Sequence, residues 1–477
     1  MINQKEKMDT ICAIATPAGG ALGIIRVSGP EAITAADRIF RPRVGAPLSQ
    51  RAASSLTFGN VVVPQTDEVV DEVLVSLFRS HHSYTGEDSV EFSCHGSYYI
   101  LNKVVELLLA QGCRMARPGE YTERAFLNGK MDLSQAEAVA DLIASTTEAN
   151  HRMAMQQMRG GFSKELRTLR DQLLHITSLL ELELDFSDHE ELEFASRPEL
   201  LALAERIRNH ISGLCQSFRL GNALKRGVPV ALVGETNAGK STLLNALVGE
   251  ERALVSNVHG TTRDTIEETV NVGGTLVRFI DTAGIRETSD TVERMGIERT
   301  FDKMAEADIV LWLIDLTVYQ AQYDELAEKI GAQVQGKHLV VLLNKTDLVS
   351  ESTINEAKQY ISGQLNNAVP TPMLLTLSAQ SGSGLDQLKQ LLAASLSTLQ
   401  AENNSTGTIV SNLRHYEALS AALAATDRVI EGLHQGLSGD FVSQDLRECI
   451  YHLSDIVGEV TTDQVLGNIF KHFCVGK

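Results

Sequence analysis

The sequence predicts an α/β plus α fold: a mixed α/β N-terminal domain, then a discontinuous helical domain interrupted by a doubly wound α/β domain. Three observations support this fold class. Short apolar runs separated by glycine and proline fill residues 1–125, as in several strands joined by turns. Helical spacing of apolar residues begins near Ser134 and returns after Ser411. Between these stretches, four buried-strand segments alternate with helical ones, which is typical of a parallel sheet.

The length of 477 residues exceeds what one hydrophobic core normally supports, so three domains are expected. The ends of a compact domain lie close together, and such a domain can therefore be inserted into another. The predicted hinges are Arg226-Gly227 and the polar segment 401–407. The predicted segments are an N-terminal domain at 1–125, the first part of the helical domain at 126–224, the inserted α/β domain at 225–390 and the second helical part at 391–477.

Composition excludes several classes of protein. No apolar run is long enough to span a bilayer and the N-terminus lacks a signal-peptide core, so we expect a cytoplasmic protein without a membrane contact. The six cysteines are scattered without a CxxC pair, which argues against a disulfide framework or a zinc site. A net charge of −19 argues against a broad nucleic-acid-binding surface, although it is compatible with a local basic patch.

A phosphate-binding loop is predicted at residues 234–241, where the sequence GETNAGKS matches GxxxxGK[ST]. An apolar strand precedes it and a helical segment follows it. Glycine lets the backbone N–H groups curl around phosphates, and the start of the helix adds a favourable dipole. Lys240 is expected to reach the β- and γ-phosphates, and Ser241 to hold Mg²⁺.

Three further motifs follow in order at predicted strand ends. Asp281 to Gly284 has the DxxG form, which contacts Mg²⁺ indirectly and senses the γ-phosphate. Asn344 to Asp347 has the NKxD form, in which the aspartate accepts two hydrogen bonds that guanine supplies and adenine does not. Ser378-Ala379 occupies the place of a third base-contacting loop. Together these motifs predict a Ras-like domain that binds and hydrolyses GTP.

The expected GTP-binding residues lie in five segments of the inserted domain. They are Asn237, Ala238, Gly239, Lys240, Ser241, Thr242; Ser256, Asn257, Val258, His259, Gly260, Thr261, Thr262; Asp281, Thr282, Ala283, Gly284; Asn344, Lys345, Thr346, Asp347; and Ser378, Ala379, Gln380.

Hydrolysis needs a group that orients the attacking water. Many small GTPases use a glutamine directly after DxxG, but Ile285 stands here and cannot do so. The acidic residues downstream, Glu287, Asp290 and Glu293, are candidates. From composition alone, a solvated charge on a helix face is the favoured interpretation of Glu293.

Asn237 in the phosphate loop suggests a second cation. Its amide oxygen would lie beside the phosphates, and residues 256–262 offer carbonyl and hydroxyl oxygens that suit a hard cation. A monovalent ion there would neutralise charge as an arginine finger does elsewhere. The alternative is an ordinary polar loop.

The chain resembles the tRNA-modification GTPase family MnmE (TrmE) over essentially its whole length. The matching segments are ATPAGGALGIIRVSG (15–29), YTGEDSVEFSCHG (84–96), RPGEYTERAFLNGKMDLSQAEA (117–138), the phosphate loop with its helix, GTTRDTIEE (260–268), DTAGIRETSDTVERMGIER (281–299) and the terminal FCVGK. Other GTPases share only the central motifs. The resemblance therefore concerns the whole chain.

The resemblance implies a folate-binding N-terminal domain that mediates homodimerisation, a helical domain and an inserted Ras-like GTPase domain. It implies that the flavoprotein MnmG (GidA) is the partner in a heterotetramer or larger complex. Together they would add a carboxymethylaminomethyl or aminomethyl group at C5 of the wobble uridine of certain tRNAs. A tetrahydrofolate derivative, 5-formyl- or 5,10-methylene-tetrahydrofolate, would supply the one-carbon unit.

The resemblance also implies roles for individual residues. Glu293 would position the catalytic water, and Lys240 and Cys474 would complete the catalytic set. The implied ligands are Asn237, Ser256, Val258 and Thr261 for K⁺, Ser241 and Thr262 for Mg²⁺, and Arg26, Glu91, Lys130 and Lys477 for folate.

Some positions depart from the family pattern, and some leave alternatives. Ala18 stands where many members have a second proline, and Gln380 where lysine or arginine is commoner. Cys474 fits either a frayed tail or a catalytic thiol near the folate site. A ribosome-assembly switch of the Era or EngA type is the alternative function, although the segment after the G domain is helical and acidic rather than a basic KH-like module. A folate sensor that gates a partner protein is a third.

Overall fold

The computed structural model describes residues 9–185, 197–249, 268–280, 304–334, 336–365, 373–402, 408–471, 473 and 476. The chain divides into two compact units, each with its own interior. The first consists of Met1–Ile143, Gln156–Glu190 and Leu446–Lys477, and the second of Ala144–Met155 and Glu191–Asp445.

A seven-stranded sheet forms the centre of the N-terminal part, in the order β3-β4-β5-β6-β2-β1-β7. All its neighbouring strands are antiparallel except β1 and β7. The strands are β1 (Ile11–Ile14), β2 (Leu22–Ser28), β3 (Phe40–Pro42), β4 (Ser55–Val62), β5 (Val69–Phe78), β6 (Ser89–His95) and β7 (Arg114–Met115).

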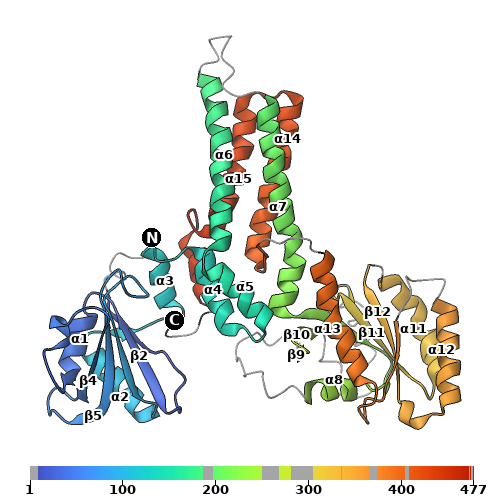
Figure 1. Ribbon diagram of the computed structural model, residues 1–477, viewed down its shortest axis with the longest axis horizontal. Coiled ribbons are helices and arrows are strands. Elements are labelled where there is room, and N and C mark those ends of the chain that lie inside the picture. Colours follow the sequence, from blue (N-terminus) through green and yellow to red (C-terminus); the bar gives the residue numbers. More distant parts are fainter. Residues whose placement is uncertain are drawn as a thin grey trace. The chain divides into compact units, whose positions relative to one another are not determined.

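Helices α1 (Ala32–Ile39) and α2 (Tyr98–Ala110) pack on one face of this sheet (Figure 1). Alternate strand residues such as Ile25, Val27 and Phe92 point into the core that these helices cover. Residues between them, including Arg26 and Glu91, point to the opposite face. Tyr121 of α3 (Glu120–Leu127) packs there against Ile11 and Ala13. The pleat therefore separates an apolar core from a polar face.

A six-stranded sheet forms the centre of the second unit, in the order β13-β12-β11-β8-β10-β9. Only the β9–β10 pair is antiparallel, so the carboxyl ends of the other five strands share one edge. The strands are β8 (Val228–Val233), β9 (Glu268–Val272), β10 (Thr275–Ile280), β11 (Ile309–Asp315), β12 (His338–Asn344) and β13 (Met373–Thr376).

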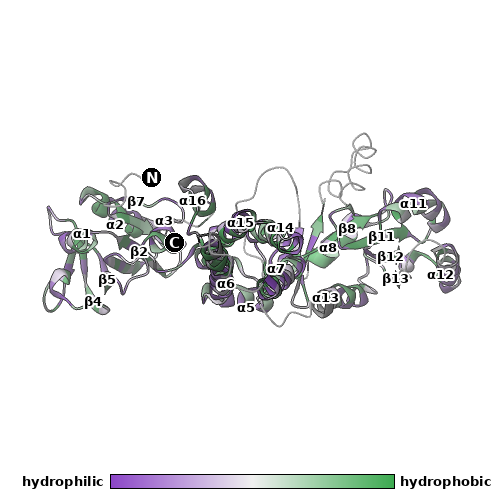
Figure 2. Ribbon diagram, turned by 90° about the horizontal axis from the view of Figure 1, so that it is seen from above, coloured by the Kyte–Doolittle hydropathy of each residue, from purple (hydrophilic) through white to green (hydrophobic). Residues whose placement is uncertain are grey.

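Helices cover both faces of this sheet. Residues of α8 (Lys240–Gly249), α13 (Leu385–Glu402) and the end of α7 (Arg197–Arg226) pack on one face, and those of α11 (Tyr319–Gln333) and α12 (Glu351–Leu365) on the other. Figure 2 shows hydrophobic colour on β8 and mixed colour on α11 and α12, as expected for a strand buried on both faces and for amphipathic helices. The predicted doubly wound domain is confirmed.

The remaining helices confirm the two predicted helical stretches, which begin near Ser134 and after Ser411. Asn412 caps α14 by accepting a hydrogen bond from Arg414 N, and Gly436 ends it in the left-handed conformation. No helix in the described part of the chain is long and apolar enough to cross a membrane. These helices are α4 (Leu133–Ala144), α5 (Glu148–Met158), α6 (Gly161–Asp185), α14 (Leu413–Gln435), α15 (Gly439–Val457) and α16 (Asp463–Phe470).

The predicted limits of the domains remain predictions. Residues 125, 224 and 390 lie inside α3, α7 and α13. The predicted hinge at Arg226-Gly227 falls where α7 ends and β8 begins, and most of the hinge at 401–407 lies outside the described residues.

Candidate functional site

The loop between β8 and α8 is shaped by two residues with left-handed backbone. Asn237 has φ 63° and Gly239 has φ 101°. A Cβ atom at Gly239 would lie 2.3 Å from Nδ2 of Asn344, and one at Gly234 would lie 2.4 Å from the carbonyl oxygen of Leu313. Neighbouring strand ends therefore pass too close to this loop for a side chain, and both positions need glycine.

Lys240, the first residue of α8, folds its side chain back over the phosphate loop. Its Nζ atom donates to the carbonyl oxygens of Gly234 at 2.6 Å and Glu235 at 2.8 Å. Ser241 and Thr242 follow in the first turn of the helix, where backbone N–H groups and the helix dipole favour an anion. Positive charge and hydrogen-bond donors are thus concentrated where the phosphates are predicted to bind.

Asn344 connects three strand ends of the parallel sheet. It is buried at the end of β12. Its Nδ2 donates to the carbonyl oxygen of Ala238 at 2.8 Å, and its Oδ1 accepts from the backbone N–H of Ala379 at 3.0 Å. Ala238 belongs to the phosphate loop after β8, and Ala379 belongs to the loop after β13. One side chain therefore links three motifs that are separate in the sequence.

The two loops that carry the predicted base-contacting residues are ordered turns. The backbone N–H of Ser378 donates to the carbonyl oxygen of Ser383 at 2.9 Å, which closes the third base loop. Lys345 has a left-handed backbone with φ 65°. Asp347 and Gln380 are exposed at the surface of their loops. The predicted base-contacting residues are therefore presented on ordered turns beside the phosphate loop.

Asp315, at the end of β11, contacts Lys345 of the NKxD motif, although no sequence motif predicted a role for Asp315. Its Oδ2 accepts from Nζ of Lys345 at 2.6 Å, and its Oδ1 accepts from Oγ1 of Thr317 at 2.7 Å. Burial alone would raise the pKa of Asp315. Hydrogen bonds from Lys345 and Thr317 outweigh burial, so the pKa of this carboxyl is lowered and it stays ionised.

Part of the predicted site lies outside the described residues. This applies to residues 256–262 and 281–284 and to Glu293, Cys474 and Lys477. Each predicted cation retains one ligand in the described part, Ser241 for Mg²⁺ and Asn237 for K⁺, and both offer the oxygen donors that hard cations prefer. Among the described residues, no group of three or more His, Cys, Asp or Glu side chains could hold a metal ion.

Arg26 and Glu91 form a cross-strand ion pair on the polar face of the N-terminal sheet. They are direct partners in the β2–β6 register, with Nε and Oε1 2.8 Å apart. The guanidinium lies 5.6 Å from the ring centre of Tyr84 and 5.5 Å from that of Tyr121. The hydroxyl of Tyr121 also donates to the carbonyl oxygen of Arg26 at 2.7 Å. The structure thus brings two of the predicted folate residues together between aromatic rings.

Lys130, a third predicted folate residue, is bonded to a different segment. Its Nζ donates to the carbonyl oxygen of His81 at 2.7 Å, in a turn where His81 has φ 65°. Asn128 also contacts the loop between β5 and β6, because its Nδ2 donates to the carbonyl oxygen of Thr85 at 2.8 Å. Lys130 is exposed, so its ammonium group lies at the surface.

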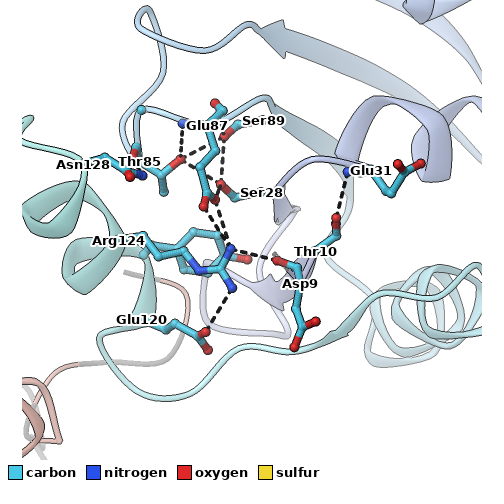
Figure 3. Close-up of polar contacts among 12 residues, drawn as sticks. Asp9, Thr10, Ser28, Glu31, Thr85, Glu87, Ser89, Glu120, Arg124 and Asn128 are labelled. Carbon is cyan, nitrogen blue, oxygen red and sulfur yellow. Dashed lines mark hydrogen bonds and ion pairs between the residues drawn. The ribbon is translucent and has the colours of Figure 1, made fainter. Parts of the chain in front are cut away.

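Figure 3 shows Arg124 of α3 lying between two carboxylates. Its Nη1 is 3.1 Å from Oε2 of Glu87, and its Nη2 is 3.2 Å from Oε1 of Glu120. The same Nη1 donates to the carbonyl oxygen of Asp9 at 2.8 Å. The Arg124 side chain is only 7% exposed and that of Glu120 only 2%, so this pair is almost fully removed from water.

Glu120 also accepts three hydrogen bonds from residues that precede it, one of them from Nη1 of Arg114 to its Oε2 at 2.9 Å. Nη2 of Arg114 is 2.6 Å from its Oε1, and the backbone N–H of Arg117 is 2.8 Å from its Oε2. Burial would raise the pKa of Glu120. These donors outweigh burial and lower the pKa to about 2. The buried carboxylate therefore anchors the start of α3 to the N-terminal sheet.

The C-terminal helix α16 packs against the start of the helical segment. Leu466 and Phe470 form a buried cluster with Leu133 and Ala136. A Cβ atom at Gly119 would lie 2.6 Å from the carbonyl oxygen of Phe470, which shows how closely the chain approaches there. Gly119 has φ 69°, so glycine satisfies both the backbone conformation and the close approach.

The end of the tail reaches the polar face of the N-terminal sheet. The backbone carbonyl of Gly476 accepts a hydrogen bond from Nη1 of Arg26 at 3.2 Å. Gly476 is buried with φ 93°, and a Cβ atom there would lie 2.8 Å from the carbonyl oxygen of Ile14. The second-last residue of the chain is therefore fixed beside a predicted folate residue.

Sequence reasoning missed three contributors to these sites. Asp315 ends an apolar strand, and its place at the carboxyl end of a parallel strand was the signal that could have found it. Tyr84 and Tyr121 lie within two segments that carried the family resemblance. Their approach to Arg26 depends on the β2–β6 register and on the packing of α3, which no local pattern reveals.

Two family models match the chain and together span most of it. The model described as "GTP-binding protein TrmE N-terminus" matches residues 10–130, and the model described as "MnmE helical domain" matches residues 133–474.

Curated relatives match over nearly the full length. A tRNA modification GTPase MnmE from Bacteroides fragilis is 58% identical over 470 residues, which is 98% of this chain and 99% of the relative. Proteins of the same name are 58% identical in Bacteroides thetaiotaomicron and 48% identical in Christiangramia forsetii, each over 98% of this chain and 99% of the relative.

Among solved structures, the chain is similar to Era in a complex with MgGDPNP and a segment of 16S ribosomal RNA. The identity is 26%, the match covers 42% of this chain and 66% of that one, and the TM-score is 0.28. A score this low does not indicate a shared overall fold.

Proposed function

The chain belongs to the MnmE family of tRNA modification GTPases, and from this premise we propose a division of labour between its two α/β parts. It is a GTP hydrolase that takes part in tRNA modification. In the proposal, the second unit hydrolyses GTP with the help of potassium, and the N-terminal domain holds a tetrahydrofolate derivative. The family match over nearly the whole chain favours this function over a ribosome-assembly switch.

The contact of Asn344 with both Ala238 and Ala379 is the observation that best supports the nucleotide site. It joins the predicted phosphate loop to the predicted base loops at one edge of the parallel sheet. GTP bound there would place its phosphates at the start of α8 and its base beside Asp347. Lys240 would then exchange its bonds to Gly234 and Glu235 for bonds to phosphate oxygens, because a charged phosphate oxygen is a stronger acceptor than a neutral carbonyl oxygen.

Hydrolysis is proposed to depend on a potassium ion and on Glu293. Ser241 with Thr262 would hold Mg²⁺, and Asn237 with Ser256, Val258 and Thr261 would hold K⁺. The two cations would supply charge neutralisation at the phosphates. Glu293 takes the place of the missing glutamine, since Ile285 has no side-chain group that can accept a hydrogen bond from water. The carboxylate would orient the attacking water by accepting a hydrogen bond from it.

The test is GTP turnover in potassium and in sodium at equal ionic strength, with Glu293→Ala beside the wild type. We expect turnover at least about tenfold higher in potassium. We expect Glu293→Ala to lower it about a hundredfold, the usual contribution of a positioned acid–base group.

Glu298→Ala is the matched control, because it removes the same type of side chain from the same segment. It should leave turnover nearly unchanged. Turnover that does not respond to the cation or to Glu293→Ala would leave a GTPase but overturn the proposed mechanism.

The N-terminal domain is proposed to bind 5-formyl- or 5,10-methylene-tetrahydrofolate through Arg26, Glu91, Lys130 and Lys477. The ion pair between Arg26 and Glu91 offers a donor and an acceptor side by side, which fits the alternating donors and acceptors of a pterin ring. Tyr84 and Tyr121 flank the guanidinium and keep it in place. The bound folate would supply the one-carbon unit of the modification.

Calorimetric binding of 5-formyltetrahydrofolate to wild type and Arg26→Met tests this part. We expect affinity to fall at least about tenfold, because a charged hydrogen-bond donor is lost. Arg43→Met is the matched control: it removes an arginine from an exposed ion pair with Glu72 on the same sheet. Equal folate affinity in Arg26→Met and wild type would contradict the assignment.

Cys474 is proposed to act as a thiol near the folate site. The support is the position of Gly476, two residues further on, whose carbonyl accepts from Arg26. We expect Cys474→Ala to keep GTP turnover and to abolish modification of wobble uridine in cells that lack the natural protein. Modification that persists with the alanine variant would remove the cysteine from the mechanism.

The partners are proposed from the family as well. They are a second copy of the chain, the flavoprotein MnmG (GidA) and tRNA, and the compartment is the cytoplasm. The net charge of −19 leads us to propose that the flavoprotein provides much of the tRNA-binding surface. A tRNA affinity of this chain alone equal to that of the complex would contradict this.

A further inference from the structure

We propose that Asp315 is a specificity-determining positioning residue that holds Lys345 and thereby orients the loop that presents Asp347 to guanine. The inference rests on the proposed nucleotide site and adds a residue that belongs to none of its motifs. Asp315 ends β11, between the strand that leads to the phosphate loop and the strand that leads to the base loop.

Both carboxylate oxygens of Asp315 are used inside the protein. Oδ2 accepts from Nζ of Lys345 at 2.6 Å, and Oδ1 accepts from the N–H and the Oγ1 of Thr317 at 2.9 and 2.7 Å. The backbone N–H of Asp315 donates to Oε1 of the buried Gln322 at 2.8 Å. The Asp315 side chain is 8% exposed. A carboxylate held from so many sides is a fixed point rather than a mobile surface charge.

Lys345 needs such a fixed point because its backbone is in a disfavoured conformation. Its φ of 65° and ψ of 38° are left-handed, a region that non-glycine residues occupy rarely and at a cost in free energy. The ion pair with Asp315 holds the side chain of Lys345 toward β11. A short charge-assisted hydrogen bond at a largely buried site offsets part of this backbone cost.

The anchored lysine fixes the loop on one side, and other bonds fix its remaining members. Asn344 is held by Ala238 and Ala379, and the N–H of Leu348 donates to the carbonyl oxygen of Lys345 at 3.0 Å. Asp347 is the exception. Its side chain is exposed and makes no hydrogen bond within the described residues.

The base-recognising carboxylate is therefore oriented by the turn alone, and Asp315 acts on it through Lys345. A turn whose anchor is lost samples other conformations, and each of them moves the carboxylate of Asp347 away from the guanine N1–H and amino group. This misplacement of Asp347 should weaken the binding of guanine more than that of a base with fewer donors, because guanine depends on both hydrogen bonds.

The experiment measures the dissociation constants of GDP and inosine diphosphate for the full chain. Inosine lacks the 2-amino group, so the ratio of the two constants reports on Asp347. In Asp315→Asn, which keeps the shape but removes the charge, we expect GDP to bind about tenfold more weakly. The dissociation constant of inosine diphosphate should rise less. The ratio of the inosine diphosphate constant to the GDP constant should therefore fall at least about threefold.

Two further variants separate positioning from a general loss of structure. Thr317→Val removes one exposed donor to Asp315 and should move the ratio in the same direction by a smaller factor. Asp308→Asn is the matched control: it breaks an aspartate ion pair with Arg219, next to the opposite end of β11. It should leave both constants unchanged. Melting curves on every variant identify loss of folding.

A double-mutant cycle then tests the route through Lys345. In a Lys345→Met background, Asp315→Asn should have almost no further effect on the ratio. Equal weakening of both nucleotides by Asp315→Asn, or additive effects in the cycle, would overturn the inference while leaving the nucleotide site intact. A wild-type chain that binds GDP no better than ADP would instead overturn the proposed function.

Discussion

The two sheets of this chain place their polar groups in opposite ways. In the mostly parallel sheet of the second unit, the groups of the candidate nucleotide site lie in loops at one edge, after β8, β11, β12 and β13. In the mostly antiparallel N-terminal sheet, they lie on a face. There Arg26 and Glu91 pair across two strands, and Arg124 of α3 lies between Glu87 and Glu120.

The difference follows from topology. Parallel strands have all their carboxyl ends at one edge, so short motifs that follow these strands lie close together there. Antiparallel neighbours carry theirs to opposite edges, and polar residues can converge only across strands or with a helix packed on the sheet. We therefore expect changes at the edge to affect nucleotide chemistry, and changes on the polar face to affect stability, the tail and the proposed folate binding.

The largest expected effect is on the stability of the polar face. Arg124→Met leaves Glu120 and Glu87 without their shared cation, and breaking a buried ion pair costs about 3–5 kcal/mol. The measurement is chemical denaturation followed by a probe in the N-terminal domain. GTP turnover by the folded variant should be unchanged, because Arg124 belongs to the first unit.

Arg43→Met provides the comparison, since Arg43 pairs with Glu72 at an exposed position. Its denaturation midpoint should stay close to that of the wild type. Equal destabilisation by the two variants would show that burial of the network around Arg124 has no special weight.

The next effect is on turnover at the parallel edge. Lys240→Ala removes the cation at the start of α8, and we expect GTP hydrolysis to fall about 10²–10³-fold, as when a preorganised donor is removed from a transition state. Steady-state phosphate release measures it. Lys329→Ala, an exposed lysine on α11, is the control. A normal rate in Lys240→Ala would contradict the predicted role of the loop.

A third effect depends on pH and concerns Glu120. The pKa of this carboxyl is lowered from 4.5 to about 2 in the folded chain. Its contribution is therefore fully present above pH 4.5 and is lost as the pH falls toward 2. The shift corresponds to about 3 kcal/mol over this window.

Denaturation of wild type and Glu120→Gln from pH 7 to pH 3 isolates that contribution, because all other carboxyl groups are common to both proteins. The glutamine variant should lose less stability on acidification. Parallel curves for the two proteins would contradict the assigned pKa.

The smallest effect concerns the tail. Gly119→Ala strains a left-handed position and brings a Cβ atom 2.6 Å from the carbonyl oxygen of Phe470, which should cost about 1–3 kcal/mol and loosen α16. Hydrogen exchange of α16 measures it. Gly129→Ala has the same φ of 69° but no atom within 4 Å of the added Cβ. Faster exchange of α16 in both variants would show that backbone strain, and not the close approach, is responsible.

The sequence predicted the fold class well because each prediction rested on a local pattern. Apolar strands between helical segments predicted the doubly wound sheet, and GETNAGKS between a strand and a helix located the loop before α8. The spacing of apolar residues predicted the long helices on both sides of the insertion. The DxxG motif, most of the cation residues and Glu293 remain predictions, since they lie beyond the described residues.

The local sequence is enough to specify which residues share a turn: Lys240 with Gly239, Asn344 with Asp347, and Ser378 with Ala379. Backbone conformation over a few residues depends on the residues themselves, so motifs of this length carry their own geometry.

Which turns and strands meet depends on the packing of the whole fold. It joined Asn344 to Ala238, 106 positions away, and Arg26 to Gly476, 450 positions away. It also set Asp315 against Lys345. Such contacts depend on strand order, register and packing, which the chain reaches by burying its apolar faces together, and no pattern confined to one segment specifies them.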